Sequence, residues 1–228
     1  GLHHRPFRIR EFMASHLDYQ TTKLKRSILE LSTIVEGNAQ KALLAFQRRD
    51  SEVAKEVIKK DKLIDSIEID LEEDCLKLIA LYQPVAIDLR MLVSMLKIND
   101  ALERIGDLSK DISKKVILLN DLPEYSSFFD FEPLFKSVSW MLTNGIDSML
   151  DLNAEQAHVV CKGENEVDKE FLKLESEIIN AMEKEPTSLR AYIHQLAVAF
   201  MMEQMGDELK KIAEDVIYTV EAKIVRHN

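Results

Sequence analysis

Three carboxylates at helical spacing are the side chains of this sequence best placed to do chemistry. They lie in the stretch Asp100-Ala101-Leu102-Glu103-Arg104-Ile105-Gly106-Asp107. At 100° per residue, Asp100, Glu103 and Asp107 would project within roughly 60° of one another on a helix. Such a stripe either faces solvent, with local Glu–Arg pairing, or holds a cation. Glycine inside a helix is ~1 kcal/mol less favourable than alanine. Because Gly106 carries this cost, we expect another backbone to approach the helix closely at this position.

The same residue types return later in the chain at constant offsets. At an offset of 100, the sequence repeats an arginine, a glutamate, a glycine and an aspartate: Arg90, Glu103, Gly106 and Asp107 return as Arg190, Glu203, Gly206 and Asp207. At an offset of 103, Asp50, Asp61 and Asp65 return as Asn153, Glu164 and Asp168. Two constant offsets indicate a tandem duplication of about 100 residues. The repetition favours a carboxylate cluster over a merely solvated acidic face.

The spacing within each repeat predicts where these carboxylates could meet. Asp61 and Asp65 are one helical turn apart, as are Glu103 and Asp107 one helix later, so antiparallel packing could gather four or five acids. Burying several like charges costs several kcal/mol per ion unless a cation neutralises them. Because all candidate ligands are oxygens, hard cations such as Mg²⁺, Mn²⁺, Ca²⁺ or ferric iron suit them better than a structural zinc. Arg90 is either a surface arginine or the partner of a middle-helix acid.

The elements that must position these residues are long helices. Six glycines and five prolines in 228 residues leave few turns, and apolar residues recur at helical spacing. We expect helices over about 16–49, 51–81, 86–119, 132–152, 153–184 and 188 to the C-terminus, with breaks at Pro84 and Pro186. The fold class is therefore all-α, with two tandem, pseudo-symmetric, antiparallel three-helix bundles over 13–122 and 132–228. Residues 123–131 are the expected linker, and residues 1–12 a cloning remnant or a disordered N-terminus.

Charge and hydropathy limit the classes of partner. The net charge of −10 and the pI of about 5.2 argue against nucleic acid and favour cations. The longest uncharged run, Ala191 to Met202, is too short and too polar to span a bilayer. Cys75 and Cys161 lie in dissimilar contexts, as expected for thiols of a reducing cytoplasm.

The motifs together resemble the PhoU family of phosphate-uptake regulators. The resemblance rests on Asp61-x-x-x-Asp65, Gln83-Pro84, Arg90 and the Asp100–Asp107 stretch, and it extends over residues 16–225. It implies two symmetric three-helix bundles whose surface carboxylates bind metal ions, iron or zinc clusters among them. It also implies a cytoplasmic, non-enzymatic homodimer that reaches the membrane only through partners. These are the phosphate ABC transporter and a membrane sensor histidine kinase, and the regulator keeps the phosphate-starvation response off when phosphate is plentiful.

Carried over residue by residue, the resemblance implies two metal sites and no catalytic residue. The first would use Asp61, Asp65, Asp100, Glu103 and Asp107, and the second Glu164, Asp168, Glu203 and Asp207, with Arg90, Arg190, Gly106 and Gly206 in supporting positions. The metal would be iron, zinc, manganese or magnesium. Phe200 stands where Asp100 would recur, so we expect the second site to bind metal more weakly or to hold fewer ions.

Two other functions compete with this hypothesis. A helical scaffold or adaptor would need no metal, and its acids would only solvate the surface. A ferritin-like di-iron oxidase would use Glu155-x-x-His158, but it needs a second Glu-x-x-His motif, and Ala191 stands three residues before His194. No Gly-rich phosphate loop or recognisable nucleophile-and-base pair occurs, so direct phosphate chemistry lacks support.

Overall fold

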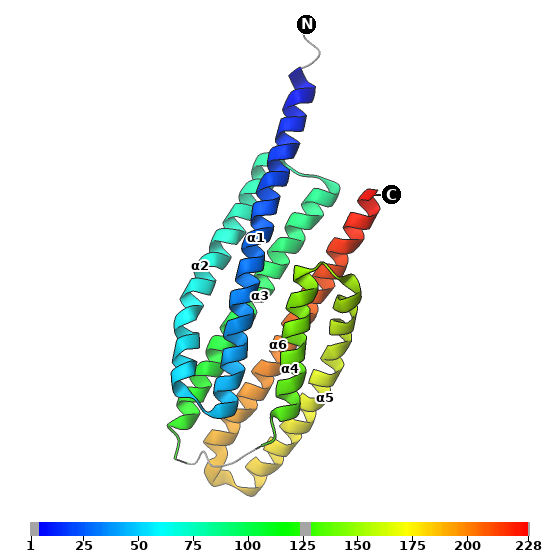
Figure 1. Cartoon of the computed structure of the whole chain (residues 1–228). Helices are drawn as coiled ribbons and strands as arrows, with labels where there is room; N and C mark the ends of the chain where they lie inside the picture. Colours follow the sequence, from blue (N-terminus) through cyan, green and yellow to red (C-terminus); the bar gives the residue numbers. More distant parts are fainter. Residues whose placement is uncertain (1–4, 124–128, 228) are drawn as a thin grey trace.

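The chain folds into six long helices. The computed structural model describes the backbone of residues 5–123 and 129–227, and the side chains of residues 10–123 and 129–221. Within these ranges lie six α-helices and one short 3₁₀ helix: α1 (Arg5–Arg48), α2 (Ser51–Tyr82), α3 (Ala86–Asn120), α4 (Glu132–Leu150), α5 (Ala154–Lys184), η1 (Pro186–Ser188) and α6 (Leu189–His227). The predicted all-α class is confirmed, and Figure 1 shows the order of the helices.

The two repeats turn between their first and second helices in the same way. Asp50 caps α2 by accepting hydrogen bonds from the backbone N–H groups of Glu52 and Val53, at 3.0 and 3.1 Å. Asn153 caps α5 at the equivalent position. The residues before these caps, Arg49 and Leu152, both adopt left-handed backbone angles, with φ of 54° and 49°. A shared cap and a shared strained residue support an origin by duplication.

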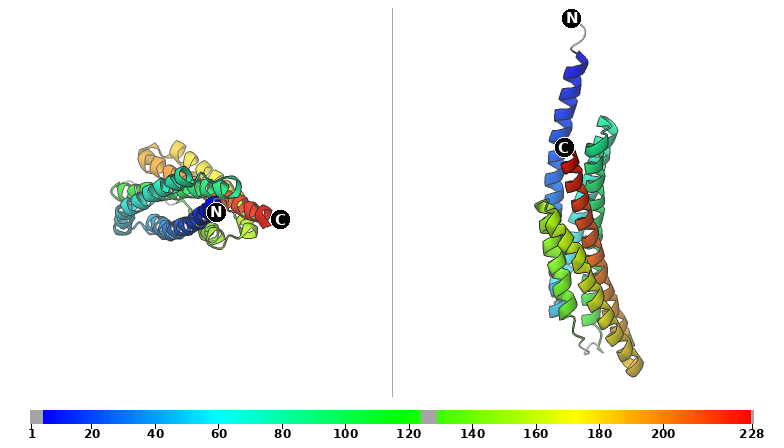
Figure 2. Two further views of the ribbon diagram at one scale, coloured as in Figure 1. Left: turned by 90° about the horizontal axis from the view of Figure 1, so that it is seen from above. Right: turned by 90° about the vertical axis from the view of Figure 1, so that its right-hand side faces the viewer.

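The helices form two three-helix bundles that lie side by side. Helices α1, α2 and α3 pack together, as do α4, α5 and α6, and α3 packs lengthwise against α6 about as extensively as against α2 (Figures 1 and 2). An ion pair crosses this seam, with Arg104 Nη1 of α3 lying 3.7 Å from Glu208 Oε1 of α6. The duplicated bundles therefore share one continuous apolar core, which includes the fully buried Leu102, Ile105 and Met205.

The N-terminal end of the chain differs from its sequence-based prediction. Helix α1 begins at Arg5, eleven residues before the expected start at about residue 16, and residues 1–4 lie outside the described part of the chain. This end of α1 projects beyond the α2–α3 connection (Figure 1). Phe12, near the start of α1, is 69% exposed. Of the expected linker 123–131, residues 124–128 also lie outside the described residues, and α4 begins at Glu132 as predicted.

The described helices include none that is long and apolar enough to cross a membrane. Both cysteines are free thiols; Cys75 is buried, whereas Cys161 is only half-buried. Burial raises the pKa of the Cys75 thiol to about 11.

Candidate metal centres

Three of the predicted carboxylates meet between α2 and α3. One oxygen each from Asp61, Asp65 and Asp107 lies within 4.8 Å of the other two. Asp61 is 4% exposed, while Asp65 and Asp107 are half-buried. The Oδ1 atom of Asp61 is buried and has no hydrogen-bond partner among the described residues. A buried carboxylate oxygen without a donor is costly, and a cation bound by all three side chains would remove that cost.

Gly106 lets α2 come close enough to α3 to form this cluster. A Cβ atom placed on Gly106 would lie 3.1 Å from Ile64 Cγ2 and 3.8 Å from Asp61 Oδ1. Gly206 allows the same close approach in the second repeat, where a Cβ would lie 3.2 Å from Val167 Cγ1. The sequence predicted close approach of another backbone; the atoms near both glycines are instead side-chain atoms, of Ile64 on α2 for Gly106 and of Val167 on α5 for Gly206.

A lysine provides the counter-charge of the first cluster. The ammonium group of Lys110 donates to Asp61 Oδ2 at 2.8 Å and to Asp107 Oδ1 at 2.9 Å. These two contacts raise the pKa of Lys110 against the opposing effect of burial, so the ammonium group stays charged. Lys110 thus occupies part of the space around Asp61 and Asp107 that a bound cation would need.

Glu103 lies beside this cluster, where it interacts with Asp107. Burial raises the pKa of Glu103 to about 8, with further contributions from its hydrogen bond to Asp107 and from nearby carboxylates. Burial alone would raise the pKa of Asp107 too, but the hydrogen bonds that it accepts from Glu103 and Lys110 lower it. Glu103 does not belong to the three-carboxylate group, but it adds a further carboxylate of the oxygen type that hard cations prefer beside it.

The second repeat forms the equivalent cluster between α5 and α6. Oxygens of Glu164, Asp168 and Asp207 lie within 4.8 Å of one another, and all three side chains are half-buried. Lys210 donates a short hydrogen bond to Glu164. Burial raises the pKa of Asp207 to about 7, with its hydrogen bond to Glu164 and the charge of Glu203 adding to the shift. Both clusters are therefore acidic groups held near a lysine, but in the second cluster it is the aspartate of the third helix, Asp207, whose pKa is raised most.

Asp100 is not brought into the first cluster. It lies outside the three-carboxylate group and pairs instead with Arg104, one turn along α3, at 3.3 Å. Its charge also adds to the effects of burial and of Glu72 that raise the pKa of Glu68.

The equivalent positions in the second repeat are aromatic. Phe171 stands at the offset of 103 from Glu68, and Phe200 at the offset of 100 from Asp100. Their ring centroids are 6.1 Å apart. Where the first repeat extends its acidic stripe, the second has an aromatic pair, so the surroundings of the two centres differ in charge although each centre has three carboxylates.

The two arginines that the sequence placed in supporting positions lie away from the clusters. Arg90 does not pair with a middle-helix acid among the described ion pairs; its guanidinium lies 4.6 Å from the centre of the Tyr218 ring on α6. The alternative of a surface arginine is the better description, because the residue is exposed. Arg190 is also exposed, and its charge acts with burial and Lys115 to lower the pKa of His194.

Sequence reasoning missed Lys110, Lys210 and Glu68. The lysines recur at the offset of 100, the same signal that identified Asp107 and Asp207. Glu68 left no such signal because its equivalent is Phe171.

The described residues contain two groups of three potential metal ligands, and every ligand atom in them is a carboxylate oxygen. This donor set fits a hard cation. Glu155 and His158 are both exposed near the start of α5 and belong to neither group, which argues against a di-iron oxidase site.

Comparison with known proteins gives one consistent result. The family described as "PhoU domain" matches residues 28–116 and again residues 132–216. A relative from Aquifex aeolicus, called a phosphate-specific transport system accessory protein PhoU homolog, is 32% identical over 203 residues, covering 89% of this chain and 92% of its own. The Escherichia coli protein called phosphate-specific transport system accessory protein PhoU is 24% identical over 219 residues, covering 96% and 91%.

Two solved structures have the same fold. The crystal structure of PhoU from Pseudomonas aeruginosa gives a TM-score of 0.85 at 26% identity, covering 90% of this chain and 98% of the other. The crystal structure of the phosphate transport system regulatory protein PhoU from Streptococcus pneumoniae gives 0.80 at 28% identity, covering 90% and 96%.

Proposed function

We propose a function that proceeds from one fact, that this chain belongs to the PhoU family. Relatives matching about nine-tenths of its length are named accessory proteins of the phosphate-specific transport system. The proposal is that this chain likewise serves phosphate transport, as a non-catalytic regulator.

The finer part of the proposal concerns the partner proteins and whether the chain represses or activates the phosphate-starvation response. By family resemblance, the chain links components of the phosphate ABC transporter to a membrane sensor histidine kinase and keeps the starvation response off when phosphate is plentiful. It would act in the cytoplasm and reach the membrane only through these partners. It would do so as a homodimer, for which light scattering should give twice the chain mass of 26.2 kDa; a monomer at working concentration would contradict this.

The metal part of the proposal rests chiefly on one observation, the buried and unpartnered Oδ1 atom of Asp61. Asp61, Asp65 and Asp107 would hold the first cation, with Glu103 as an additional oxygen ligand. Glu164, Asp168 and Asp207 would hold the second, with Glu203 beside them. Iron, zinc, manganese and magnesium are the candidates, and a bound ion would supply positive charge that fixes the α2–α3 and α5–α6 contacts. Asp100 would take part only at a distance, because it already pairs with Arg104.

Elemental analysis of the native protein tests the metal proposal. The wild type should carry iron, manganese or zinc after supplementation, whereas Glu103→Ala/Asp107→Ala should lose most of the metal of the first site. Asp111→Ala is the matched control, because Asp111 is an aspartate of the same helix whose described ion pair is with Lys114, outside the cluster. Equal metal content in the wild type and the double variant would refute the proposal.

A metal-independent scaffold is the second candidate function, and one observation favours it. Lys110 and Lys210 already partly neutralise the two clusters without any bound ion. Under this alternative, the clusters only stabilise the bundles.

A phosphate-starvation reporter in cells lacking this protein tests the regulatory role and separates the two candidates. The reporter should be active at high phosphate and silenced by the wild-type chain. Restored silencing by the metal-free double variant, at normal protein level, would support the scaffold. An unchanged reporter in cells lacking the protein would refute the regulatory role.

A further inference from the structure

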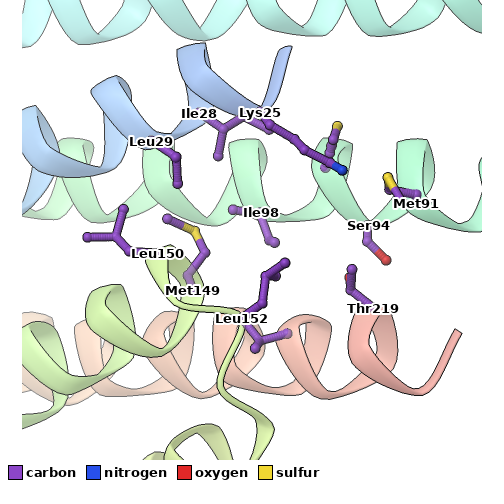
Figure 3. A pocket seen from close by; sticks show the side chains of 12 residues that line it. Lys25, Ile28, Leu29, Met91, Ser94, Ile98, Met149, Leu150, Leu152 and Thr219 are labelled. Carbon is purple, nitrogen blue, oxygen red and sulfur yellow. The ribbon is translucent and has the colours of Figure 1, made fainter. Parts of the chain in front are cut away.

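A cavity separate from both carboxylate clusters lies where the two bundles meet. It measures about 120 Å³ and is lined by residues of α1, α3, the last turn of α4 with the residues after it, and α6. Figure 3 shows its walls, in which Ile28, Leu29, Ile98 and Met149 present apolar side chains. Leu150, another lining residue, is 38% exposed, so the cavity lies within reach of the surface.

One polar group in the wall has no partner. Ser94 of α3 is 2% exposed, and its hydroxyl makes no hydrogen bond with any described residue. Other buried hydroxyls on these helices bond back to a carbonyl one turn earlier, as Ser109 does to Ile105 at 2.7 Å and Ser113 to Ser109 at 2.9 Å. The Ser94 oxygen instead lies on the side of the α3 wall that faces α6, where Thr219 lines the same end of the cavity (Figure 3). A buried hydroxyl without a hydrogen-bond partner costs free energy, so the unpaired Ser94 hydroxyl calls for a structural explanation.

The second repeat has a larger side chain at the equivalent position. The residue equivalent to Ser94 is His194, and its Nδ1 atom lies 2.9 Å from Lys115 Nζ across the α3–α6 seam. The first repeat has a smaller side chain that leaves both space and an unpaired donor. Around it, the residues equivalent to Met149 and Leu152 are Phe46 and Arg49, which line a more polar hollow between the bundles. The cavity beside Ser94 is therefore the apolar member of a related pair.

We propose that this cavity binds a small molecule with an apolar body about the size of benzene and a single hydroxyl group. An apolar cavity of about 150 Å³ is known to take up benzene, so the volume here suits a slightly smaller or partly protruding ligand. The Ser94 hydroxyl would donate to the ligand oxygen. The ligand hydroxyl would donate to Thr219 Oγ1, which gives its own proton to Asp215 O at 2.8 Å and can still accept. Lys25, at the same end of the cavity, has interactions of its own and is assigned no role.

Calorimetric titration of the full chain with phenol and with benzene tests the proposal. Both should bind saturably to the wild type. Ser94→Ala should weaken phenol binding about five-fold and leave benzene binding unchanged, because one hydrogen bond is removed from the phenol complex alone. Ser109→Ala is the matched control, since this buried serine of the same helix lies outside the cavity, and it should alter neither affinity.

Two further measurements keep the test decisive. Ser94→Leu should fill the cavity and abolish binding of both probes; if that variant does not fold, Ser94→Ala decides alone. In the ligand-free protein, Ser94→Ala should not lower the urea midpoint, whereas Ser109→Ala should, because only Ser109 loses a hydrogen bond. Absence of saturable phenol binding to the wild type, or an equal effect of Ser94→Ala and Ser109→Ala on it, would overturn the proposal.

Discussion

Replacing Gly106 by alanine measures how tightly α2 and α3 must pack to form the first carboxylate cluster. Alanine is worth ~1 kcal/mol more than glycine inside a helix, so an unobstructed site would gain stability. At Gly106 the new Cβ would lie 3.1 Å from Ile64 Cγ2, closer than ordinary van der Waals contact. Overpacking of this kind costs ~1–3 kcal/mol. The net result should be a loss of ~0–2 kcal/mol of unfolding free energy, measured by urea denaturation of the metal-free protein.

Gly37→Ala supplies the matched control for this prediction. Gly37 is an exposed glycine within α1, and a Cβ there would have nothing within 4 Å. This variant should gain ~1 kcal/mol, so the two alanine variants should differ by ~1–3 kcal/mol. Ile64→Leu removes the Cγ2 branch and should recover part of the loss when combined with Gly106→Ala. If Gly106→Ala stabilises the protein as much as Gly37→Ala does, the helices are not held at close approach and the reasoning fails.

Three further predictions follow from charged and aromatic contacts. Lys110→Met should lower the unfolding free energy of the metal-free protein by ~2–3 kcal/mol in urea denaturation, because buried Asp61 loses the ammonium group that pairs with it. Added divalent metal should restore the stability of this variant. A loss no larger than that of Lys114→Met, at an exposed lysine, would contradict this. Burial raises the pKa of Asp215 to about 6, so its ionisation destabilises the folded chain as pH rises from 3.8 through 6. Asp215→Asn should therefore add ~1 kcal/mol at pH 7, after allowing for its partial exposure, and nothing at about pH 4, and an equal gain at both pH values would exclude this cause. Phe171→Glu with Phe200→Asp should give the second cluster the acidic surroundings of the first and raise its metal affinity in titrations; unchanged affinity would show that these positions are irrelevant.

The helices were predictable to within a few residues where polar caps and prolines mark their ends. Asp50 and Asn153 cap the starts of α2 and α5. Pro84 and Pro186 lie just after the ends of these two helices. The start of α1 was not predictable from caps, because residues 5–12 contain no Ser, Thr, Asp or Asn.

The candidate site was predictable as far as the repeat extends. The offset identified the carboxylates that meet, but it could not show that Asp100, two turns from Asp107, pairs with Arg104 instead. Comparison of the two copies could not identify Glu68, because the equivalent residue in the second repeat is Phe171 and no acidic residue is repeated there. Contacts across the α3–α6 seam, such as Arg104 with Glu208, depend on how the bundles pack and have no counterpart in the spacing of a single helix.

The projecting end of α1 makes the two otherwise similar halves of the molecule distinguishable. A protein that recognises only the shared three-helix pattern could bind either half, in two orientations related by the internal symmetry. The second repeat offers no equivalent of this end, because α4 begins only at Glu132, directly after the connection. A complex that includes the surface around Phe12, 69% exposed, can therefore form in one orientation only, which fixes which of the two unequal carboxylate clusters faces the bound protein.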